Sequence, residues 1–164
     1  MSKQHYINRN IAIKKLKELS EIKTPGSQFY FLRNLDVFVF EEMILLALKK
    51  KGYKIIYNKA YTGDGGIDGR AYLNDQHYLI QAKRYTNHIN PRDVEEFITL
   101  CKRRKGKGLF VHTGKTGGKS WDMARGTDID IISGERLLEF FLKAVPQAKY
   151  GLFSQLVNSL FRQK

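Results

Sequence analysis

Apolar residues along the chain follow two periods, one typical of helices and one typical of strands. In the segment 8–22 they recur at every third position, at Ile13, Leu16, Leu19 and Ile22, with lysines between them. This spacing predicts a short, basic amphipathic helix. The sequence TPGSQ that follows contains Pro and Gly, which predicts that the helix ends there.

A longer apolar segment, DVFVFEEMILLALKKKG, predicts a second helix over residues 36–52. Asp36 is a residue type that caps a first helical turn, and Gly52 fits the position after the last turn, where a left-handed backbone is common. The three lysines before Gly52 complement the partial negative charge at the end of a helix. Both ends of this helix are therefore marked in the sequence.

Short segments rich in β-branched and aromatic residues, bounded by turn residues, predict strands at 53–58, 67–73 and 77–83. Further along, we expect strands at 108–113 and 129–133, helices at 90–104 and 134–144, and a short helix or loop at 118–126. This order predicts an α/β fold with a mixed central sheet of about five strands flanked by helices.

The last segment, GLFSQLVNSLFRQK, places its apolar residues on one stripe of a helix. Two interpretations remain open, because the stripe can either close the core of the same chain or form the seam of a homodimer. We divide the chain into a basic N-terminal helical extension at 1–35, a central α/β domain at 36–145 and a C-terminal amphipathic helix at 146–164.

The charge composition of the chain indicates what kind of partner it binds. The chain of 164 residues fits one domain, and its 29 Lys and Arg against 16 Asp and Glu give a net charge of +13. A charge this large indicates a polyanionic partner, either a nucleic acid or an anionic membrane. The sequence has no apolar run long enough for a membrane span and no apolar signal segment, so we expect a cytoplasmic protein without a membrane partner. The single cysteine, Cys101, is expected to be a buried apolar residue on a helix.

A hairpin is expected at the two-residue turn Asn74-Asp75, because Asn and Asp tolerate the positive φ angles of such turns. Paired positions in an antiparallel hairpin sum to a constant, which places Asp68 opposite Gln81. Alternation along the strand puts Lys83 on the same face as Gln81. A carboxylate, an amide and an ammonium group are therefore expected to converge.

This combination of groups suits the hydrolysis of a phosphodiester bond. The reaction needs a hard divalent cation, and Asp68 and Gln81 offer an anionic and a neutral oxygen ligand. Lys83 is suited to orient or deprotonate the attacking water and to stabilise charge on the phosphoryl oxygens. The neighbouring glycines allow a tight turn and the close approach of a phosphate.

The strings GDGGIDGRAYL and HYLIQAKRY, with the upstream helix FEEMILLALKKKGYKI, resemble the catalytic domain of Mrr-type restriction endonucleases of the PD-(D/E)XK superfamily. The resemblance covers about residues 36–142 and implies a restriction-endonuclease-like fold. It also implies a Mg²⁺-dependent DNA endonuclease in which Mn²⁺ can replace Mg²⁺. Asp68 would be the motif aspartate, Gln81 and Lys83 the QxK half, and Glu41 the helix carboxylate that completes the metal site. Many superfamily members have Glu in place of Gln81, which leaves the number of metal ions open.

Several cations have two interpretations, as phosphate contacts or as solvated surface. Arg84 and Tyr85 follow Lys83 directly and are expected to hold the DNA strand that is cut. A basic run at the end of the helix predicted at 90–104 and a basic loop after the following strand are further candidates for phosphate contact. They are Lys102, Arg103, Arg104, Lys115 and Lys119.

Two other functions remain open. Dimeric, positively charged members of the same superfamily include structure-selective nucleases such as Holliday junction resolvases, which the resemblance also allows. The chain can alternatively be a nucleic-acid-binding module that has lost activity, with Gln81 as the lesion. Such a module would bind DNA with a salt-dependent affinity that is indifferent to Mg²⁺.

Overall fold

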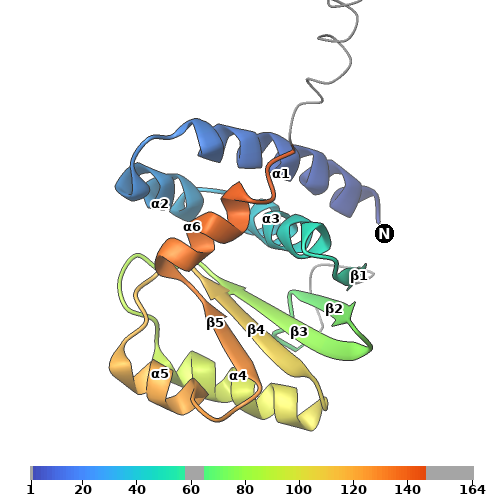
Figure 1. Ribbon diagram of the computed structural model, residues 1–164, viewed down its shortest axis with the longest axis vertical. Helices are drawn as coiled ribbons and strands as arrows, with labels where there is room; N and C mark the ends of the chain where they lie inside the picture. Colours follow the sequence, from blue (N-terminus) through green and yellow to red (C-terminus); the bar gives the residue numbers. More distant parts are fainter. Residues whose placement is uncertain (1, 58–64, 147–164) are drawn as a thin grey trace, which may run out of the picture.

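Five strands form one mixed sheet, and helices cover both of its faces (Figure 1). The computed structural model describes residues 2–57 and 65–146. The strands are β1 (Lys54–Ile56), β2 (Gly69–Leu73), β3 (Gln76–Lys83), β4 (Lys107–His112) and β5 (Ile129–Ile132). The helices are α1 (Lys3–Glu21), α2 (Pro25–Arg33), α3 (Val37–Lys50), α4 (Pro91–Arg103), α5 (Gly118–Ala124) and α6 (Gly134–Leu142). The α/β architecture and the strand count expected from the sequence are confirmed.

The strands lie in the sheet in the order in which they occur in the chain. β1, β2 and β3 pair in antiparallel fashion, whereas β3, β4 and β5 run parallel to one another. The parallel connections pass through α4 and α5, as expected because parallel neighbours need a crossover. β3 is therefore the strand at which the antiparallel and parallel halves of the sheet meet.

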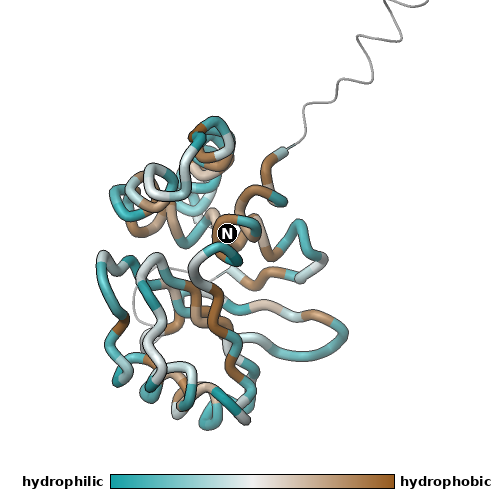
Figure 2. The backbone as a smooth tube through the Cα atoms, turned by 60° about the vertical axis from the view of Figure 1, so that its left-hand side comes forward, coloured by the Kyte–Doolittle hydropathy of each residue, from teal (hydrophilic) through white to brown (hydrophobic). Residues whose placement is uncertain are grey.

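Two apolar clusters hold the helices to the sheet. α1, α2, α3 and α6 lie on one face, around a cluster that includes Phe40, Ile80 and Phe141. α4 and α5 lie on the other face, around a smaller cluster that includes Phe97 and Phe110. In Figure 2 hydrophobic positions gather between the helices and the sheet, and the outer turns are mostly hydrophilic. This burial is the main favourable contribution to folding.

The N-terminal helix is longer than its apolar spacing predicted. It begins at Lys3 because the side chain of Ser2 accepts a hydrogen bond from the His5 backbone N–H and caps the first turn. Its buried stripe includes polar side chains, which hid the first two turns from an analysis based on apolar residues. The stripe consists of His5, Asn8, Ala12, Leu16 and Leu19. α1 packs against α3, which carries part of the candidate site.

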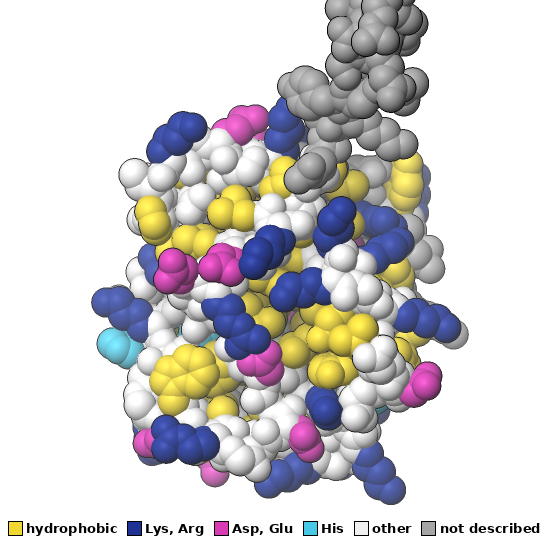
Figure 3. All heavy atoms as spheres, in the orientation of Figure 1, with side chains coloured by type: hydrophobic (Ala, Val, Ile, Leu, Met, Phe, Trp, Pro, Cys, Tyr) yellow, Lys and Arg dark blue, Asp and Glu magenta, His cyan; other side chains and the backbone are white. Residues whose placement is uncertain are grey.

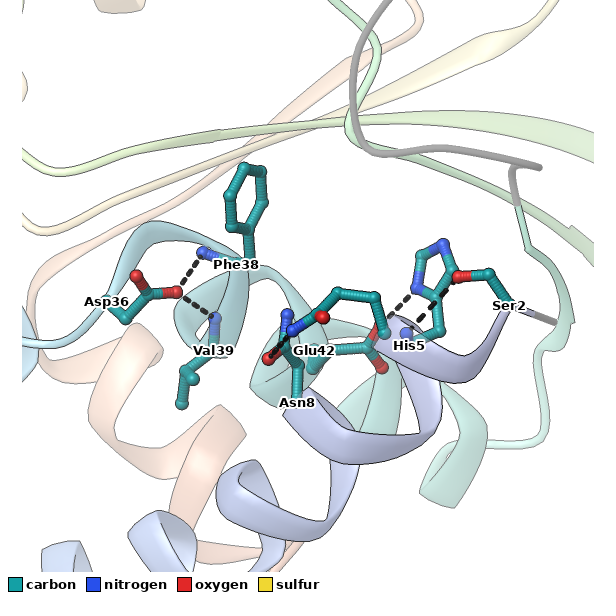
Figure 4. A network of polar contacts seen from close by, with 8 residues as sticks. Ser2, His5, Asn8, Asp36, Phe38, Val39 and Glu42 are labelled. Atoms are coloured by element: carbon teal, nitrogen blue, oxygen red, sulfur yellow. Dashed lines mark hydrogen bonds and ion pairs between the residues drawn. The ribbon is translucent and has the colours of Figure 1, made fainter.

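The sequence TPGSQ ends α1 but also begins another helix, which the sequence analysis did not predict. Thr24 caps α2 by accepting a hydrogen bond from the Ser27 backbone N–H, and Pro25 occupies the first helical turn, where its missing N–H costs nothing. The helix predicted from Asp36 is confirmed, with the Asp36 carboxylate accepting hydrogen bonds from the Phe38 and Val39 backbones (Figure 4).

Two expectations fall on segments that are not described. The C-terminal amphipathic helix, with its proposed dimer seam, lies outside the described residues except for Pro146, as do Gly63 and Asp64 of the GDGG sequence. In the ranges 2–57 and 65–146, no helix is long and apolar enough to cross a membrane. Figure 3 shows Lys and Arg side chains spread over the face seen there, with fewer Asp and Glu.

Candidate active site

The hairpin of β2 and β3 has the predicted register. Asn74 and Asp75 form the turn with φ angles of 48° and 60°. Leu73 pairs with Gln76 at one end of the ladder, and the pairing continues without a slip to the start of β2. Asp68 lies just before β2, and its backbone N–H donates to the carbonyl of Ile80 at 2.9 Å. The turn chemistry therefore fixes which β3 residues lie beside Asp68.

The Asp68 carboxylate accepts a backbone hydrogen bond from β3 just before β2 begins. Its Oδ2 atom accepts a hydrogen bond of 2.7 Å from the backbone N–H of Ala82, in the place of a strand carbonyl. Burial raises the pKa of Asp68, while the Ala82 hydrogen bond and the nearby Lys83 ammonium group act in the opposite direction. Asp68 is thus a positioned carboxyl group in a poorly solvated environment.

Gln81 is oriented by the glycine turn that precedes Asp68. Its Nε2 atom donates to the carbonyl of Gly66 at 2.9 Å. Gly65 and Gly66 have φ angles of 66° and 87°, which favour glycine, and so bring this carbonyl to Gln81. The Oε1 atom of Gln81 is buried and has no hydrogen-bond partner among the described residues. A buried amide oxygen without a partner is costly, so it marks a place where a ligand can bind.

Glu41 approaches the same site from α3. Its side chain is only 7% exposed, and its Oε2 atom is buried without a hydrogen-bond partner in the part of the chain that the structure describes. Burial raises the pKa of Glu41 to about 8, and the negative charge of Asp68 is the next largest cause. Glu42 and Asp36 raise it further, whereas Arg84 lowers it. The structure therefore brings Glu41 close enough to Asp68 for the charge of Asp68 to disfavour the ionised form of Glu41.

The neighbouring Glu42 faces a different part of the molecule. Successive residues of a helix point about 100° apart, so two adjacent glutamates cannot serve one site. Glu42 is fully buried, and its Oε1 atom lies 2.6 Å from Nδ1 of His5 on α1 (Figure 4). The sequence left the choice between the two glutamates to a family resemblance, whereas the structure turns only Glu41 toward Asp68.

A groove runs beside these residues, between β3 and α4. Its volume is about 510 Å³, and Gln81, Lys83, Gly65 and Gly66 line one side of it. Residues of α4 from Arg92 to Arg103 line the other. We call it the β3–α4 groove. It gives an extended ligand access to Gln81 and Lys83.

The donor set is suited to a hard cation. Two carboxylates and one amide oxygen are the ligand types that Mg²⁺ prefers, and two of these oxygens are buried without a hydrogen-bond partner in residues 2–57 and 65–146. No group of three or more His, Cys, Asp and Glu residues that could hold a metal occurs in the described ranges. The donors found here are two acids, Glu41 and Asp68, with the amide of Gln81 as the third.

The cations predicted to contact DNA do not all lie in one place. The Arg84 guanidinium donates to the backbone carbonyls of Arg33 and Leu35, just before α3. The Tyr85 hydroxyl donates to the carboxylate of Asp93 on α4. Both residues therefore make intramolecular contacts that hold helices to the end of β3.

Of the remaining predicted cations, Arg103 lines the β3–α4 groove. Lys102 faces a separate pocket on the other side of α4, and Arg104 is exposed at the C-cap of that helix. Lys115 and Lys119 are exposed in the connection from β4 to α5 and the first turn of α5. Only Arg103 of these five thus shares a described cavity with Gln81 and Lys83.

Arg33 has a position that the sequence analysis missed. Its Nε atom donates to the Tyr85 carbonyl at 3.0 Å and its NH2 group to the Thr113 carbonyl at 2.8 Å. These carbonyls follow the ends of β3 and β4, so one side chain of α2 joins two strand ends beside the site. No local pattern reveals this role, because the partners lie 52 and 80 positions away in the sequence.

His112 is buried at the end of β4, next to Lys83 in the sheet register. Its Nδ1 atom accepts from the Gly114 backbone N–H at 3.1 Å, so Nε2 carries the proton and lies 3.0 Å from the Thr116 hydroxyl. Burial lowers the pKa of His112 to about 4. Both ring nitrogens are thus satisfied within the protein, which favours a structural role.

The geometry of the hairpin and of α3 agrees with the result of a family comparison. The Mrr_cat family model, described as restriction endonuclease, matches residues 32–141, which are 110 of the 164 residues. The chain belongs to this restriction endonuclease family. The match includes Glu41, Asp68, Gln81 and Lys83 within one family domain.

Two solved restriction endonucleases share the fold. The MspJI restriction endonuclease, in complex with a 27-mer oligonucleotide, is 22% identical with a TM-score of 0.58, and the match covers 84% of this chain and 34% of that one. The DNA modification-dependent restriction endonuclease AspBHI is 15% identical with a TM-score of 0.52, and the match covers 98% of this chain and 41% of that one. The chain thus spans well under half of each relative. No curated protein matches it.

Proposed function

We propose that this member of the restriction endonuclease family is a Mg²⁺-dependent DNA endonuclease of the Mrr-like restriction type, in which Mn²⁺ can replace Mg²⁺. The observation that carries the proposal is a pair of buried oxygen atoms, Oε2 of Glu41 and Oε1 of Gln81, beside the Asp68 carboxylate; neither has a hydrogen-bond partner among the described residues. A folded protein tolerates such a cost where a ligand offsets it. A divalent cation is the ligand that matches two carboxylates and an amide oxygen.

Glu41, Asp68 and Gln81 would hold the metal ion. When bound, it would polarise the phosphate and lower the pKa of the attacking water. The Ala82 hydrogen bond would keep the Asp68 carboxylate at the strand edge, and the Gly66 carbonyl would keep the amide oxygen of Gln81 turned away from the glycine turn. The protein thus prepares its ligands before the cation arrives.

Lys83 would act on the reacting groups directly. Its ammonium group lies close enough to Asp68 to lower the pKa of that carboxyl, and it lines the β3–α4 groove. From there it would orient the attacking water and stabilise the negative charge that develops on the phosphoryl oxygens. These two tasks do not require Lys83 to bind DNA tightly.

DNA is the substrate that the family supports best. The net charge of +13 suits a polyanion, and one relative of the same fold was solved with an oligonucleotide. AspBHI is described as DNA modification-dependent, and cleavage of methylated against unmethylated duplexes tests for the same preference here. The same site would also serve a structure-selective nuclease, and branched and linear duplexes distinguish the two substrates.

The first test is plasmid nicking and linearisation with Mg²⁺, Mn²⁺ or EDTA. We expect wild type to cut with either metal ion, and Asp68→Asn and Lys83→Ala to lose cleavage while Lys83→Ala keeps its DNA affinity. Equal cutting by Lys83→Ala would reject the role of that residue. A folded wild type that binds plain, methylated and branched DNA but cuts none of them would favour an inactive binding module.

A further inference from the structure

Helix α4 separates two concave regions, and the basic run KRRKGK is divided between them. Arg103 lines the β3–α4 groove. Lys102, Lys105 and Lys107 instead line a second pocket of about 690 Å³, at the opposite end of β3 from Lys83. We call this second region the basic pocket. Its other lining residues include Gln76, Cys101 and Asp128.

The three lysines of the basic pocket have no ion-pair partner among the residues that the structure describes. In the described ranges none of them forms an ion pair or a side-chain hydrogen bond. Some other surface cations are paired, as Arg136 is with Asp130 at 2.5 Å. The helix dipole accounts for a cation in the last turn of α4, such as Lys102, but not for Lys105 and Lys107, which lie beyond the helix. Asp128 is the one acidic residue among those that line the pocket, so the three lysines leave it with an excess of positive charge.

The walls of the basic pocket are fixed by backbone hydrogen bonds. Lys105 has a left-handed backbone with φ 51°, and the following Gly106 N–H donates to the Cys101 carbonyl at 3.1 Å. Across the pocket, the Gly108 N–H donates to the Asp128 carbonyl at 2.9 Å. The lysine stems thus start from a rigid turn, which reduces the entropy lost when they bind an anion.

We propose that the basic pocket is a second DNA-backbone site, in which Lys102, Lys105 and Lys107 neutralise phosphodiester groups of the duplex that is cut. Lysine ammonium groups contact phosphate as point charges, and the Gln76 amide adds a neutral donor. No exposed aromatic side chain lines the pocket, so it offers no surface on which a base could stack. The chemistry therefore selects the backbone of DNA and not its bases.

This inference rests on the proposed function for the position of the cut. Gln76 in the basic pocket and Gln81 at the metal site are five residues apart on β3, which corresponds to about 17 Å along a strand. With a rise of about 3.4 Å per base pair, the two sites would contact one duplex about five base pairs apart. The basic pocket would then control affinity and register on DNA, while the chemical step would depend on Lys83 and the metal ligands.

The test compares two triple variants that lose the same charge. In the basic-pocket variant, Lys102→Gln and Lys107→Gln are combined with Lys105→Asn, because Asn tolerates a left-handed backbone. The control combines Lys14→Gln, Lys17→Gln and Lys23→Gln, three exposed lysines on and after α1. Affinity for a fluorescent duplex is measured in EDTA over a series of salt concentrations, and thermal melting verifies that both variants fold.

We expect the slope of log affinity against log salt to fall by about 2 to 3 in the basic-pocket variant and by less than about 1 in the control. With Mg²⁺, the DNA concentration that gives half-maximal cleavage should rise in the basic-pocket variant and not in the control. An equal loss of slope in both variants would show a general effect of net charge and overturn the proposal. A mononucleotide that loses affinity for the variant while the duplex does not would overturn it as well.

The two proposals fail in different experiments. Metal-dependent cleavage with an unchanged salt slope in the basic-pocket variant would reject the second backbone site and leave the endonuclease intact. A wild type that never cuts, but whose salt slope falls in the basic-pocket variant and not in the control, would reject the endonuclease and retain the DNA contact.

Discussion

Two buried glutamates lie on different faces of α3, about 100° apart, and differ in how their charge is satisfied. On one side Glu42 meets the imidazole of His5 at 2.6 Å, in the packed contact between α1 and α3. On the other side Glu41 has no ion-pair partner within the described residues; the largest effect of negative charge on it comes from Asp68, and Arg84 acts in the opposite direction.

The difference separates structure from function within two adjacent positions of one helix. A buried carboxylate with an internal partner adds to the specificity of packing. A buried carboxylate without one lowers the stability of the fold, and a protein retains it where a ligand supplies the missing charge. The comparison therefore assigns Glu42 to the fold and Glu41 to the proposed metal site.

The strongest test of this assignment replaces each glutamate with glutamine, which is neutral and has nearly the same shape. We expect Glu41→Gln to reduce Mg²⁺-dependent plasmid cleavage by more than about 100-fold, because a weakened metal site loses several kcal/mol of transition-state stabilisation. Glu42→Gln is the matched control and should retain cleavage at a temperature where it is folded. Wild-type cleavage by Glu41→Gln would remove this residue from the site.

Changes to the His5–Glu42 pair should instead alter the free energy of unfolding. His5→Ala should lower the free energy of unfolding by about 3 kcal/mol, because it leaves the Glu42 carboxylate buried without its imidazole. In urea unfolding, the double variant His5→Ala with Glu42→Gln should lose less than the sum of the two single losses. Additive losses would mean that the two side chains do not support each other.

His112 extends the comparison to a third buried titratable group, which is also satisfied internally. Its pKa is about 4 in the folded protein and 6.5 in an ordinary environment. Between these values the unfolded chain binds a proton that the folded chain does not. The stabilisation is therefore complete above pH 6.5, is lost as the pH falls toward 4, and amounts to as much as about 3 kcal/mol.

His112→Asn should accordingly lose less stability between pH 7 and pH 4 than wild type does, although it starts from a lower value. Urea unfolding at several pH values measures this difference, and other titrating groups cancel when the two proteins are compared. The same pH dependence in both proteins would show that His112 does not remain neutral in the fold.

The smallest effect we expect is stabilisation by the cation alone. At ten times its dissociation constant, Mg²⁺ or Mn²⁺ should add about 1.4 kcal/mol to the free energy of unfolding, which raises the melting temperature by about 3–6 °C. Glu41→Gln and Asp68→Asn should lose this increase, and His112→Asn should keep it. An equal increase in all of these variants would place the cation elsewhere.

The sequence predicted the parts of the site that are set by residues close together in the chain. The Asn74-Asp75 turn sets the register of β2 and β3, and alternation then places Gln81 and Lys83 on one face. Long-range partners were not predictable in this way. Glu42 contacts His5, which lies 37 positions away in the sequence. The buried stripe of α1 contains polar residues, so the apolar periodicity of the sequence does not reveal its first turns. The choice between Glu41 and Glu42 depended on how α3 is rotated in the fold.

The reciprocal contacts of Arg33 and Arg84 bear on where a minimal functional fragment can begin. Arg33 binds the carbonyls of Tyr85 and Thr113, and Arg84 binds those of Arg33 and Leu35. A fragment that begins at residue 36 would keep every proposed metal ligand. It would lose the Arg33 guanidinium, which joins two strand ends, and the carbonyls of Arg33 and Leu35, which accept from Arg84. Transplantation of this nuclease module into another protein should therefore carry α2 along with the catalytic hairpin.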